Sequence, residues 1–286
     1  MGIVPNTHLT PHIQQQMKIT KAVLPIAGRG TRFLPVTKAV PKELLPIVDK
    51  PVLQYLIEEA VESGIEEIIF VISEDKRLIM DYLSSDKALE AFLIKKGKME
   101  ALKKVQALST LAHYHFVYQK EPNGDGDAIL SAESLVGDEP FLVLFGDDIV
   151  KHAIPAGKQL MDQFTGKSMI AVERVSMEMI SQYGVVSPGE TRGRLHEVVG
   201  LTEKPTPKEA PSDLGIIGKY ICSPAIFKAL KSTPSGKDGE LRLIDAFIEL
   251  AQSETIWAYE IEGQRFDTGR PEGLIAANNA FLKTNS

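Results

Sequence analysis

Near its start the chain contains Ala22-Val-Leu-Pro-Ile-Ala-Gly-Arg-Gly-Thr-Arg-Phe-Leu-Pro35 and, two residues later, Lys38-Ala-Val-Pro-Lys-Glu-Leu-Leu-Pro46. The apolar beginning is typical of a buried β-strand, and the glycines and basic residues after it are typical of a phosphate-binding loop. Gly28 and Gly30 let the backbone approach a ligand without a Cβ in the way, and successive N–H groups in such a turn bind anions. Arg32 and Lys42 add positive charge. The stretch therefore predicts phosphoryl chemistry on a nucleotide.

The residues after this loop predict a parallel βαβ unit. Apolar residues recur at helical spacing from Val52 to Val61, and Gly64 stands where a helix ends. Ile68-Ile-Phe-Val-Ile72 follows as a fully apolar strand. Two more strands, at 115–119 and 141–145, each end at a polar motif. The pattern predicts an α/β fold with a Rossmann-like mixed, mainly parallel central sheet flanked by helices.

The second half predicts shorter strands separated by proline and glycine, which form a small antiparallel extension that covers one side of the sheet. These strands are expected at 168–175, 183–188, 195–201, 215–221 and 255–261, with helices at 224–230 and 244–252. Residues 84–110 predict a helical insertion, a hairpin broken at Lys95-Lys-Gly-Lys98. Residues 1–16 lack a core pattern and are expected to form a flexible extension outside a single domain of residues 17–286.

Composition excludes several classes of protein. The chain has 286 residues, 43% of them hydrophobic, and a net charge of −6, which disfavours sequence-independent binding of nucleic acid. Cys222 is the only cysteine, so neither an intrachain disulfide nor a multi-cysteine metal site is possible. No apolar run has the length of a membrane span, and no signal peptide is evident. A cytoplasmic protein that does not bind membranes is expected.

Acidic residues at two strand ends predict a metal site. Asp147 and Asp148 follow the apolar strand at 141–145, and Asp267 follows the last expected strand. Taken alone, Gly146-Asp147 favours a turn. Two acidic strand ends on one sheet favour a site for Mg²⁺, which needs only one or two carboxylates together with phosphate oxygens.

Two further motifs are candidates for substrate contacts. Lys204 in Glu203-Lys204-Pro205 can bind a sugar phosphate while Glu203 accepts from sugar hydroxyls, although a surface ion pair explains the same residues. Gln119 begins the loop that ends at Gly124, and its amide can pair with the edge of a base; an ordinary polar loop residue is the alternative.

Other nucleotide and metal motifs fail on spacing. A G-x-G-x-x-G dinucleotide fingerprint would need glycine where Phe33 stands, so a Rossmann oxidoreductase is a distant alternative. Gly166-Lys-Ser lacks the first glycine of a P-loop, because Met161 occupies that position. The six histidines show no metal-ligand spacing.

From Lys18 to Phe281 these segments together resemble the sugar-1-phosphate nucleotidylyltransferases, and within them the bacterial UTP–glucose-1-phosphate uridylyltransferases. The resemblance implies a nucleotidyltransferase fold similar to glycosyltransferase A, the substrates UTP and glucose-1-phosphate, Mg²⁺, and a homodimer or homotetramer. It places the catalytic residues at Arg32 and Lys42 and the metal ligands at Asp147 and Asp267. The residues implied in nucleotide binding are Ala27, Gly28, Gly30, Thr31, Gln119 and Gly124, and those implied in sugar-phosphate binding are Gly184, Glu203 and Lys204.

The chain departs from this family pattern at two places. Gly124-Asp-Gly-Asp-Ala128 stands where the family usually has Gly-Leu-Gly-His-Ala, which puts Asp125 and Asp127 near the nucleotide, where they would weaken binding or hold a second cation. Arg242 and Ile244 replace a glutamine and a threonine on the sugar side. Base and sugar preference therefore stay open, with dTTP, another sugar phosphate or a non-catalytic sugar-nucleotide sensor as alternatives.

Overall fold

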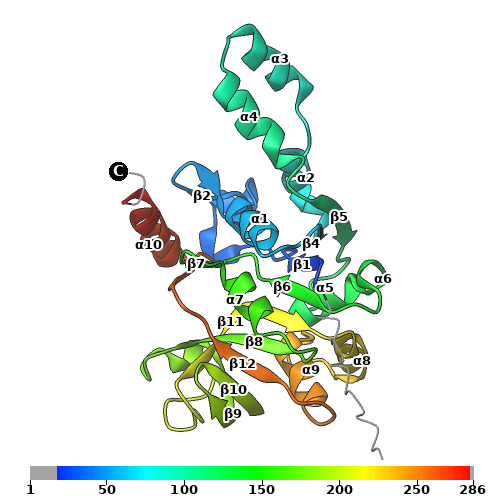
Figure 1. The fold of residues 1–286 in the computed structure, drawn as a ribbon, viewed down its shortest axis with the longest axis vertical. Coiled ribbons are helices and arrows are strands. Elements are labelled where there is room, and N and C mark those ends of the chain that lie inside the picture. The colour runs from blue at the N-terminus through cyan, green and yellow to red at the C-terminus, as the bar shows by residue number, and fades with distance from the viewer. Residues whose placement is uncertain (1–17, 284–286) are drawn as a thin grey trace, which may run out of the picture.

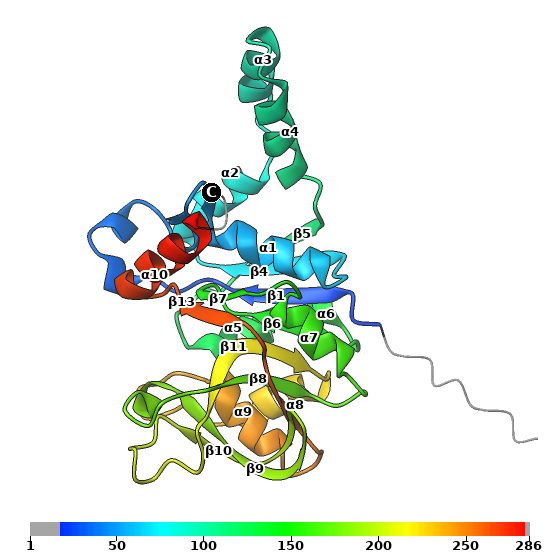
Figure 2. The same cartoon turned by 60° about the vertical axis from the view of Figure 1, so that its left-hand side comes forward.

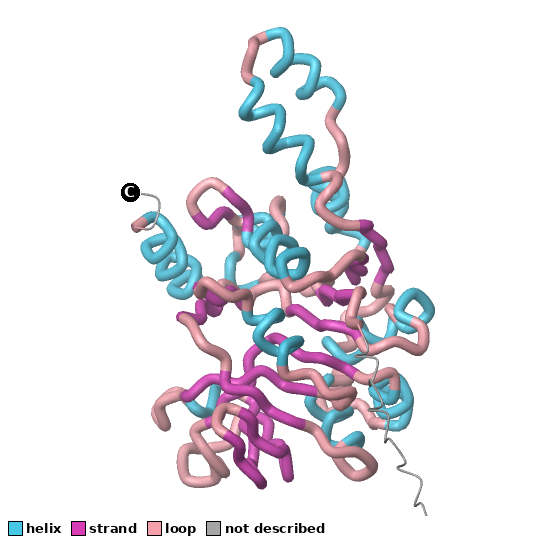
Figure 3. The backbone as a smooth tube through the Cα atoms, in the orientation of Figure 1, coloured by secondary structure: helices cyan, strands magenta, loops and turns pink. Residues whose placement is uncertain are grey.

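A nine-stranded mixed sheet runs through the computed structural model, which describes residues 18–283 (Figures 1 and 3). Four strands at one end are parallel neighbours, and antiparallel pairs follow from β11 onward, apart from the parallel pair β8 and β12. In spatial order the strands are β5 (His113–Tyr118), β4 (Glu67–Ile72), β1 (Lys21–Pro25), β6 (Phe141–Leu144), β11 (Leu214–Cys222), β8 (Met169–Arg174), β12 (Trp257–Glu260), β10 (Leu195–Glu203) and β9 (Gly184–Arg192). The predicted α/β class is confirmed.

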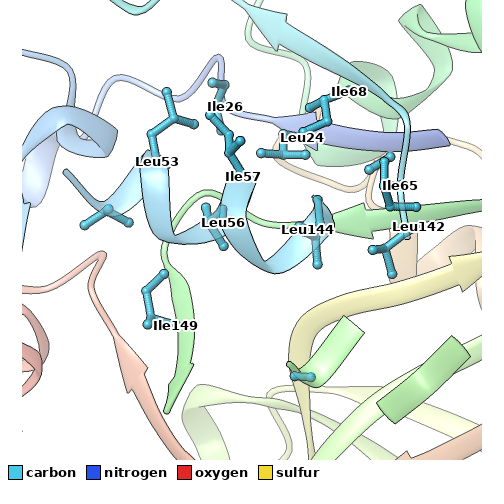
Figure 4. Close-up of a cluster of buried hydrophobic side chains, with 14 of the residues drawn as sticks. Leu24, Ile26, Leu53, Leu56, Ile57, Ile65, Ile68, Leu142, Leu144 and Ile149 are labelled. Carbon is cyan, nitrogen blue, oxygen red and sulfur yellow. The ribbon is translucent and has the colours of Figure 1, made fainter. Parts of the chain in front are cut away.

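The predicted βαβ unit forms the first core. Helix α1 (Val52–Glu62) joins β1 to β4 and turns its apolar side toward the sheet. Figure 4 shows Leu53, Leu56 and Ile57 of this helix facing Leu24 and the other buried side chains of the strands. Because side chains alternate along a strand, Val23 points into a second core on the opposite face.

Helices also cover that second face. They are α5 (Asp125–Ser131), α6 (Glu133–Val136), α8 (Ala225–Ser232) and α9 (Leu243–Leu250). Stacked rings join these helices to the sheet, with the Phe141 and Phe227 centroids 5.2 Å apart and those of Tyr220 and Phe247 5.6 Å apart. Helix α7 (Ala156–Asp162) lies with α1 on the first face. The sheet is therefore sandwiched between two helical layers.

Strands β9 and β10 correct the expected position of the antiparallel extension. They continue the sheet at its edge instead of covering its side. Irregular pairing around Val198 bends the edge, so that β9 also reaches β11 through Gly215 and Val185.

A helical hairpin projects from the body (Figures 1 and 2). It consists of α3 (Lys87–Lys95) and α4 (Met99–Leu108), which follow α2 (Arg77–Leu83) and are separated by Gly97 at φ +68°. Leu93 and Leu102 are buried as their spacing predicts. Phe92 is 50% exposed, because a projecting hairpin buries only the side that packs on its partner helix.

Some short elements were not predicted from the sequence. They include two small antiparallel sheets, β2 (Pro46–Ile47) with β3 (Lys50–Pro51) and β7 (Asp148–Lys151) with β13 (Gln264–Asp267). The last helix, α10 (Pro271–Leu282), follows β13. Short 3-10 turns include η1 (Thr31–Phe33), η2 (Val36–Lys38), η3 (Lys42–Leu44), η4 (Glu74–Lys76) and η5 (Ile180–Gln182). No helix between residues 18 and 283 combines the length and apolarity of a membrane span. The expected extension at residues 1–16 lies outside the described residues.

Candidate active site

The glycine-rich loop leaves the end of β1 and folds over η3. Gly30 has φ +63°, and a Cβ there would lie 3.1 Å from the Cβ of Lys42, so glycine permits this close approach. Thr37 Oγ1 donates a 2.9 Å hydrogen bond to the Gly30 carbonyl. Arg32 on η1 is exposed. Its charge acts on the pKa values of Lys42 and Asp147, so Arg32 adds positive charge near this pair.

Lys42 and Asp147 form an ion pair at the centre of the site. The Lys42 Nζ lies 2.6 Å from Asp147 Oδ2. Burial alone would lower the pKa of Lys42, but the negative charges of Asp147 and Glu43 raise it above its ordinary value. Burial would likewise raise the pKa of Asp147, and Lys42 holds it below its ordinary value. At neutral pH the pair is therefore an ammonium and a carboxylate.

A buried ion pair between Glu43 and Lys76 anchors η3. Glu43 is fully buried and lies 2.8 Å from the Nζ of Lys76. Lys76 also donates to the Ile26 carbonyl, next to the glycine-rich loop. Burial lowers the pKa of Lys76. This pair fixes the relative position of the loop and the turn that carries Lys42.

The small sheet of β7 and β13 places Asp267 close to Asp147. Its register pairs Asp267 with Asp148, and the Thr268 amide donates a 2.7 Å hydrogen bond to the Asp147 carbonyl. A Cβ on Gly269 would lie 2.5 Å from Asp147 Oδ2 and 3.0 Å from Asp267 Oδ1, so the two carboxylates lie close together beside Gly269. The expectation that both aspartates end strands of one sheet is wrong, because β13 belongs to this separate small sheet.

The two carboxylates fit a hard cation that also has substrate oxygens as ligands. Burial raises the pKa of Asp267, and the negative charges of Asp147 and Asp148 raise it further. A cation between the carboxylates would relieve this repulsion. Within residues 18–283 no three histidine, cysteine, aspartate or glutamate side chains are grouped to hold a metal by themselves.

The neighbouring Asp148 has a different role. Its Oδ2 accepts a 2.9 Å hydrogen bond from the Gly218 amide, and its Oδ1 pairs with Arg265. Arg265 Nη1 also contacts Glu173 and the Tyr183 hydroxyl, each at 3.0 Å. These contacts engage both carboxylate oxygens of Asp148 and hold β13 in register, while Asp147 is the aspartate that contacts Lys42.

Two cavities lie on either side of this centre. The large cavity, about 420 Å³, contains Ala27, Gly28, Lys42, Gln119, Gly124 and Asp147 in its wall. The small cavity, about 280 Å³, contains Gly184, Glu203, Lys204 and Asp267. Asp125, Phe145 and Glu240 line both, so the cavities share a wall. Of the expected residues, Gly30, Thr31 and Arg32 line neither cavity.

Lys204, which lines the small cavity, has a strained backbone conformation. Lys204 has φ +46°, which is uncommon for a residue with a side chain, and its amide donates to the Tyr183 carbonyl at 3.0 Å. Its Nζ lies 2.8 Å from Glu203 Oε1. A Cβ on Gly184 would lie 3.2 Å from Glu203 Oε2 and 2.7 Å from Ile244. Glycine therefore leaves room beside the Glu203 carboxylate.

The two aspartates of the 124–128 segment have separate partners. Asp127 Oδ2 accepts a 2.7 Å hydrogen bond from Gln119 Nε2, and Asp125 Oδ1 accepts a 2.8 Å bond from the Leu243 amide. Burial, with the charges of Glu203 and Glu240, raises the pKa of Asp125 to about 6. Neither aspartate was assigned a binding or catalytic role from the sequence, although their departure from the family pattern placed both near the nucleotide.

Arg265 and Arg270 were also missed. Both line the small cavity, and Arg270 Nε lies 3.2 Å from Asp267 Oδ2. Alternation along β13 places Arg265 on the same side as Asp267, a signal that was present in the sequence once this segment is taken as a strand.

Comparison with known proteins supplies the family. The family model described as nucleotidyl transferase matches residues 21–284. The chain belongs to this family. A UTP–glucose-1-phosphate uridylyltransferase of Bacillus subtilis is 47% identical over 266 residues, which cover 92% of this nucleotidyl transferase and 91% of that protein. A protein of the same name from Staphylococcus saprophyticus is 47% identical over 267 residues, covering 93% of each chain.

Solved structures agree with this family membership. A UDP-glucose pyrophosphorylase complexed with UDP-glucose is 39% identical, with a TM-score of 0.85 over 93% of this nucleotidyl transferase and 100% of that chain. A UTP-bound UDP-glucose pyrophosphorylase of Acinetobacter baumannii is 35% identical, with a TM-score of 0.87 over 92% and 93%. The predicted family is confirmed.

Proposed function

We propose that this chain transfers the uridylyl group of UTP to glucose-1-phosphate, forming UDP-glucose and releasing pyrophosphate. The observation that carries the proposal is the position of Lys42, Asp147 and Asp267 where two polar cavities meet. A cavity beside the glycine-rich loop suits a nucleotide, and one beside Glu203 and Lys204 suits a sugar phosphate. The names of the relatives support the same reaction.

In the proposed reaction an oxygen of glucose-1-phosphate attacks the α-phosphorus of UTP. A new phosphorus–oxygen bond forms as the bond to the bridging oxygen of pyrophosphate breaks, without a protein nucleophile. Catalysis then depends on position and on neutralising the phosphoryl oxygens. Lys42, kept protonated and directed by Asp147, supplies charge at the α-phosphate, and Arg32 supplies charge from the loop. Lys204 and Glu203 hold the sugar phosphate.

Asp147 and Asp267 are the proposed ligands of Mg²⁺. When bound, this cation neutralises charge on the phosphate oxygens of both substrates. The support is the fit described above, in which two half-buried carboxylates lie close together beside Gly269 and repel each other.

Pyrophosphate release tests the reaction. The purified protein is incubated with Mg²⁺, glucose-1-phosphate and UTP, dTTP, ATP, CTP or GTP in separate assays. Release chiefly with UTP is expected. Release only with another nucleotide would assign a different base, and absence of release with every nucleotide and a panel of hexose and amino-sugar phosphates would contradict catalysis.

We also propose that the enzyme acts in the cytoplasm as a homodimer or homotetramer, without nucleic-acid or membrane partners. The buried, unpaired Cys222 is usual for proteins in a reducing compartment. Light scattering coupled to gel filtration measures the oligomer, and a monomer at assay concentration would contradict that part.

A further inference from the structure

The side-chain amide of Gln119, in the wall of the large cavity, is held by two acceptors. Gln119 follows β5 and is 7% exposed. Its Nε2 donates to the Gly124 carbonyl at 3.0 Å and to Asp127 Oδ2 at 2.7 Å. Asp127 lies in the first turn of α5, directly after the loop that Gln119 begins. Both hydrogens of the amide are therefore used inside the protein.

These two contacts permit only one orientation of the amide. A flip of the Gln119 side chain would place Oε1 against the Gly124 carbonyl and the Asp127 carboxylate, which are both acceptors. The flipped amide would lose two hydrogen bonds, one of them to a charged group, and would gain two oxygen–oxygen contacts. Gly124 alone holds only one of the hydrogens, so Asp127 completes the restraint.

The fixed orientation leaves Oε1 available to a ligand. This oxygen has no hydrogen-bond partner within residues 18–283. It is also not fully buried, so a ligand can reach it. Because Gln119 lines the large cavity, a ligand there meets an acceptor and no donor from this amide. The ring N–H at position 3 of uracil or thymine can donate to such an oxygen. Cytosine has a lone pair at the same ring position and would oppose it.

We propose that Asp127 is a positioning residue that determines base specificity by fixing the Gln119 amide with its oxygen toward the nucleotide. The enzyme thereby favours pyrimidine nucleotides with an N–H at ring position 3 over cytidine nucleotides. This inference rests on the proposed function only where turnover is assayed. The fixed orientation of the Gln119 amide should affect nucleotide binding as well, which can be measured without turnover.

The test compares UTP with CTP in the wild-type enzyme and in D127A, D127S and D127N. Alanine and serine remove the acceptor that reaches Gln119, whereas asparagine keeps an amide oxygen in its place. We expect the ratio of kcat/KM for UTP to that for CTP to fall at least tenfold in D127A and D127S, chiefly through KM. In D127N the ratio should return to within threefold of wild type. Thermal unfolding identifies any variant that is not folded.

Calorimetric binding of UTP and CTP in the presence of Mg²⁺ separates this inference from the proposed function. If the wild type releases no pyrophosphate, the proposed reaction fails, and the same ratios measured as dissociation constants still test Asp127. A folded D127A or D127S that keeps the wild-type UTP preference overturns the inference. So does a wild-type protein that binds CTP as tightly as UTP, or a D127N that behaves like D127A.

Discussion

Lys42 obtains its position from residues that are distant in sequence. Gly30 lets the loop lie against its Cβ, and Asp147 holds its Nζ at 2.6 Å. The ammonium is thus fixed before substrate arrives, which is how a charged group stabilises a phosphoryl transition state without reorganising.

Replacing Lys42 with alanine should remove this charge with little effect on folding. We expect kcat/KM to fall by at least about 100-fold, the size of losses seen when one preorganised donor is removed. The Lys42–Asp147 pair is partly open to solvent, so the melting temperature should change little. Lys38, exposed on η2 of the same loop, provides the matched control K38A. Equal activity of K42A and K38A would show that Lys42 has no catalytic role.

Asp147 and Asp267 should determine the requirement for metal. Removal of divalent cations with EDTA should abolish activity, and excess Mg²⁺ should restore it. D267N removes one ligand charge and should raise the Mg²⁺ concentration for half-maximal activity by about tenfold or more. Activity measured against free Mg²⁺ tests this, with D162N on the surface as control. An unchanged Mg²⁺ dependence in D267N would refute its role as a ligand.

Asp125 should make the protein less stable as pH rises. Its pKa is about 6 in the folded state and 3.8 in the unfolded reference, so the folded state binds more protons between these values. Stability therefore decreases between about pH 4 and pH 6. Above pH 6 the loss is complete and amounts to roughly 3 kcal/mol. D125N, which keeps an acceptor for the Leu243 amide, should be more stable than wild type at pH 7.5 and equal at pH 4.

Urea unfolding of both proteins at the two pH values measures this difference. A D125N variant with the same stability offset at pH 4 and pH 7.5 would show that Asp125 does not titrate in this range.

At the scale of elements, the segment before α5 is fixed by contact with the segment before α9. The Leu241 amide donates to the Asn123 carbonyl at 2.6 Å, and the Gly126 amide donates to the Leu241 carbonyl at 2.9 Å. These bonds form the wall shared by the two cavities, where Asp125 and Glu240 lie.

Gly124 is the residue on which this contact depends. It has φ +106°, and a Cβ would lie 2.3 Å from the Leu241 carbonyl oxygen. G124A should therefore lose about 3 kcal/mol or more, from backbone strain together with overpacking, and KM for the nucleotide should rise. Gly137 has φ +71° with open space around it, so G137A isolates the strain and should lose about 1 kcal/mol. Equal losses in urea unfolding would contradict the packing argument.

The sequence allowed the elements with strong patterns to be predicted, and the site only where chemistry is local. Strand β1, its loop and α1 follow from apolar runs and glycines. Strands β7 and β13 have four residues each and contain Asp148, Lys151 and Arg265, so neither propensity nor alternation marks them. Their pairing brings Asp267 close to Asp147. It joins segments that are more than 100 residues apart, so local sequence patterns do not reveal it. The contact of Asp127 with Gln119 is likewise invisible in sequence because it needs side-chain geometry.

For the whole molecule, β11 connects the parallel half of the sheet to the antiparallel half. It pairs with β6 on one side and β8 on the other. Lys219 of this strand is fully buried, and its Nζ lies 2.8 Å from Glu59 Oε2 of α1 and 3.0 Å from the Asp148 carbonyl. Glu59 Oε1 in turn accepts from the Gly157 amide of α7 at 2.9 Å. We propose that these contacts help residues 17–286 to unfold as a single domain.

Removing Lys219 should destabilise the whole molecule. K219M leaves the Glu59 carboxylate buried without its cation, and we expect a loss of about 3 to 5 kcal/mol. The double variant K219M/E59Q removes both charges and keeps an acceptor for Gly157, so it should regain a large part of that loss. K231M breaks an exposed ion pair with Glu133 and should cost less than about 1 kcal/mol.

Urea unfolding followed by circular dichroism and by Trp257 fluorescence measures these free energies and tests cooperativity at once. Coincident transitions are expected, because Trp257 lies in β12 of the same continuous sheet. Since Lys219 lies at the junction of the two halves, its replacement should shift both unfolding transitions to lower urea concentration by the same amount. Separate transitions, or a K219M loss no larger than that of K231M, would show that the two halves are stable independently of this buried ion pair.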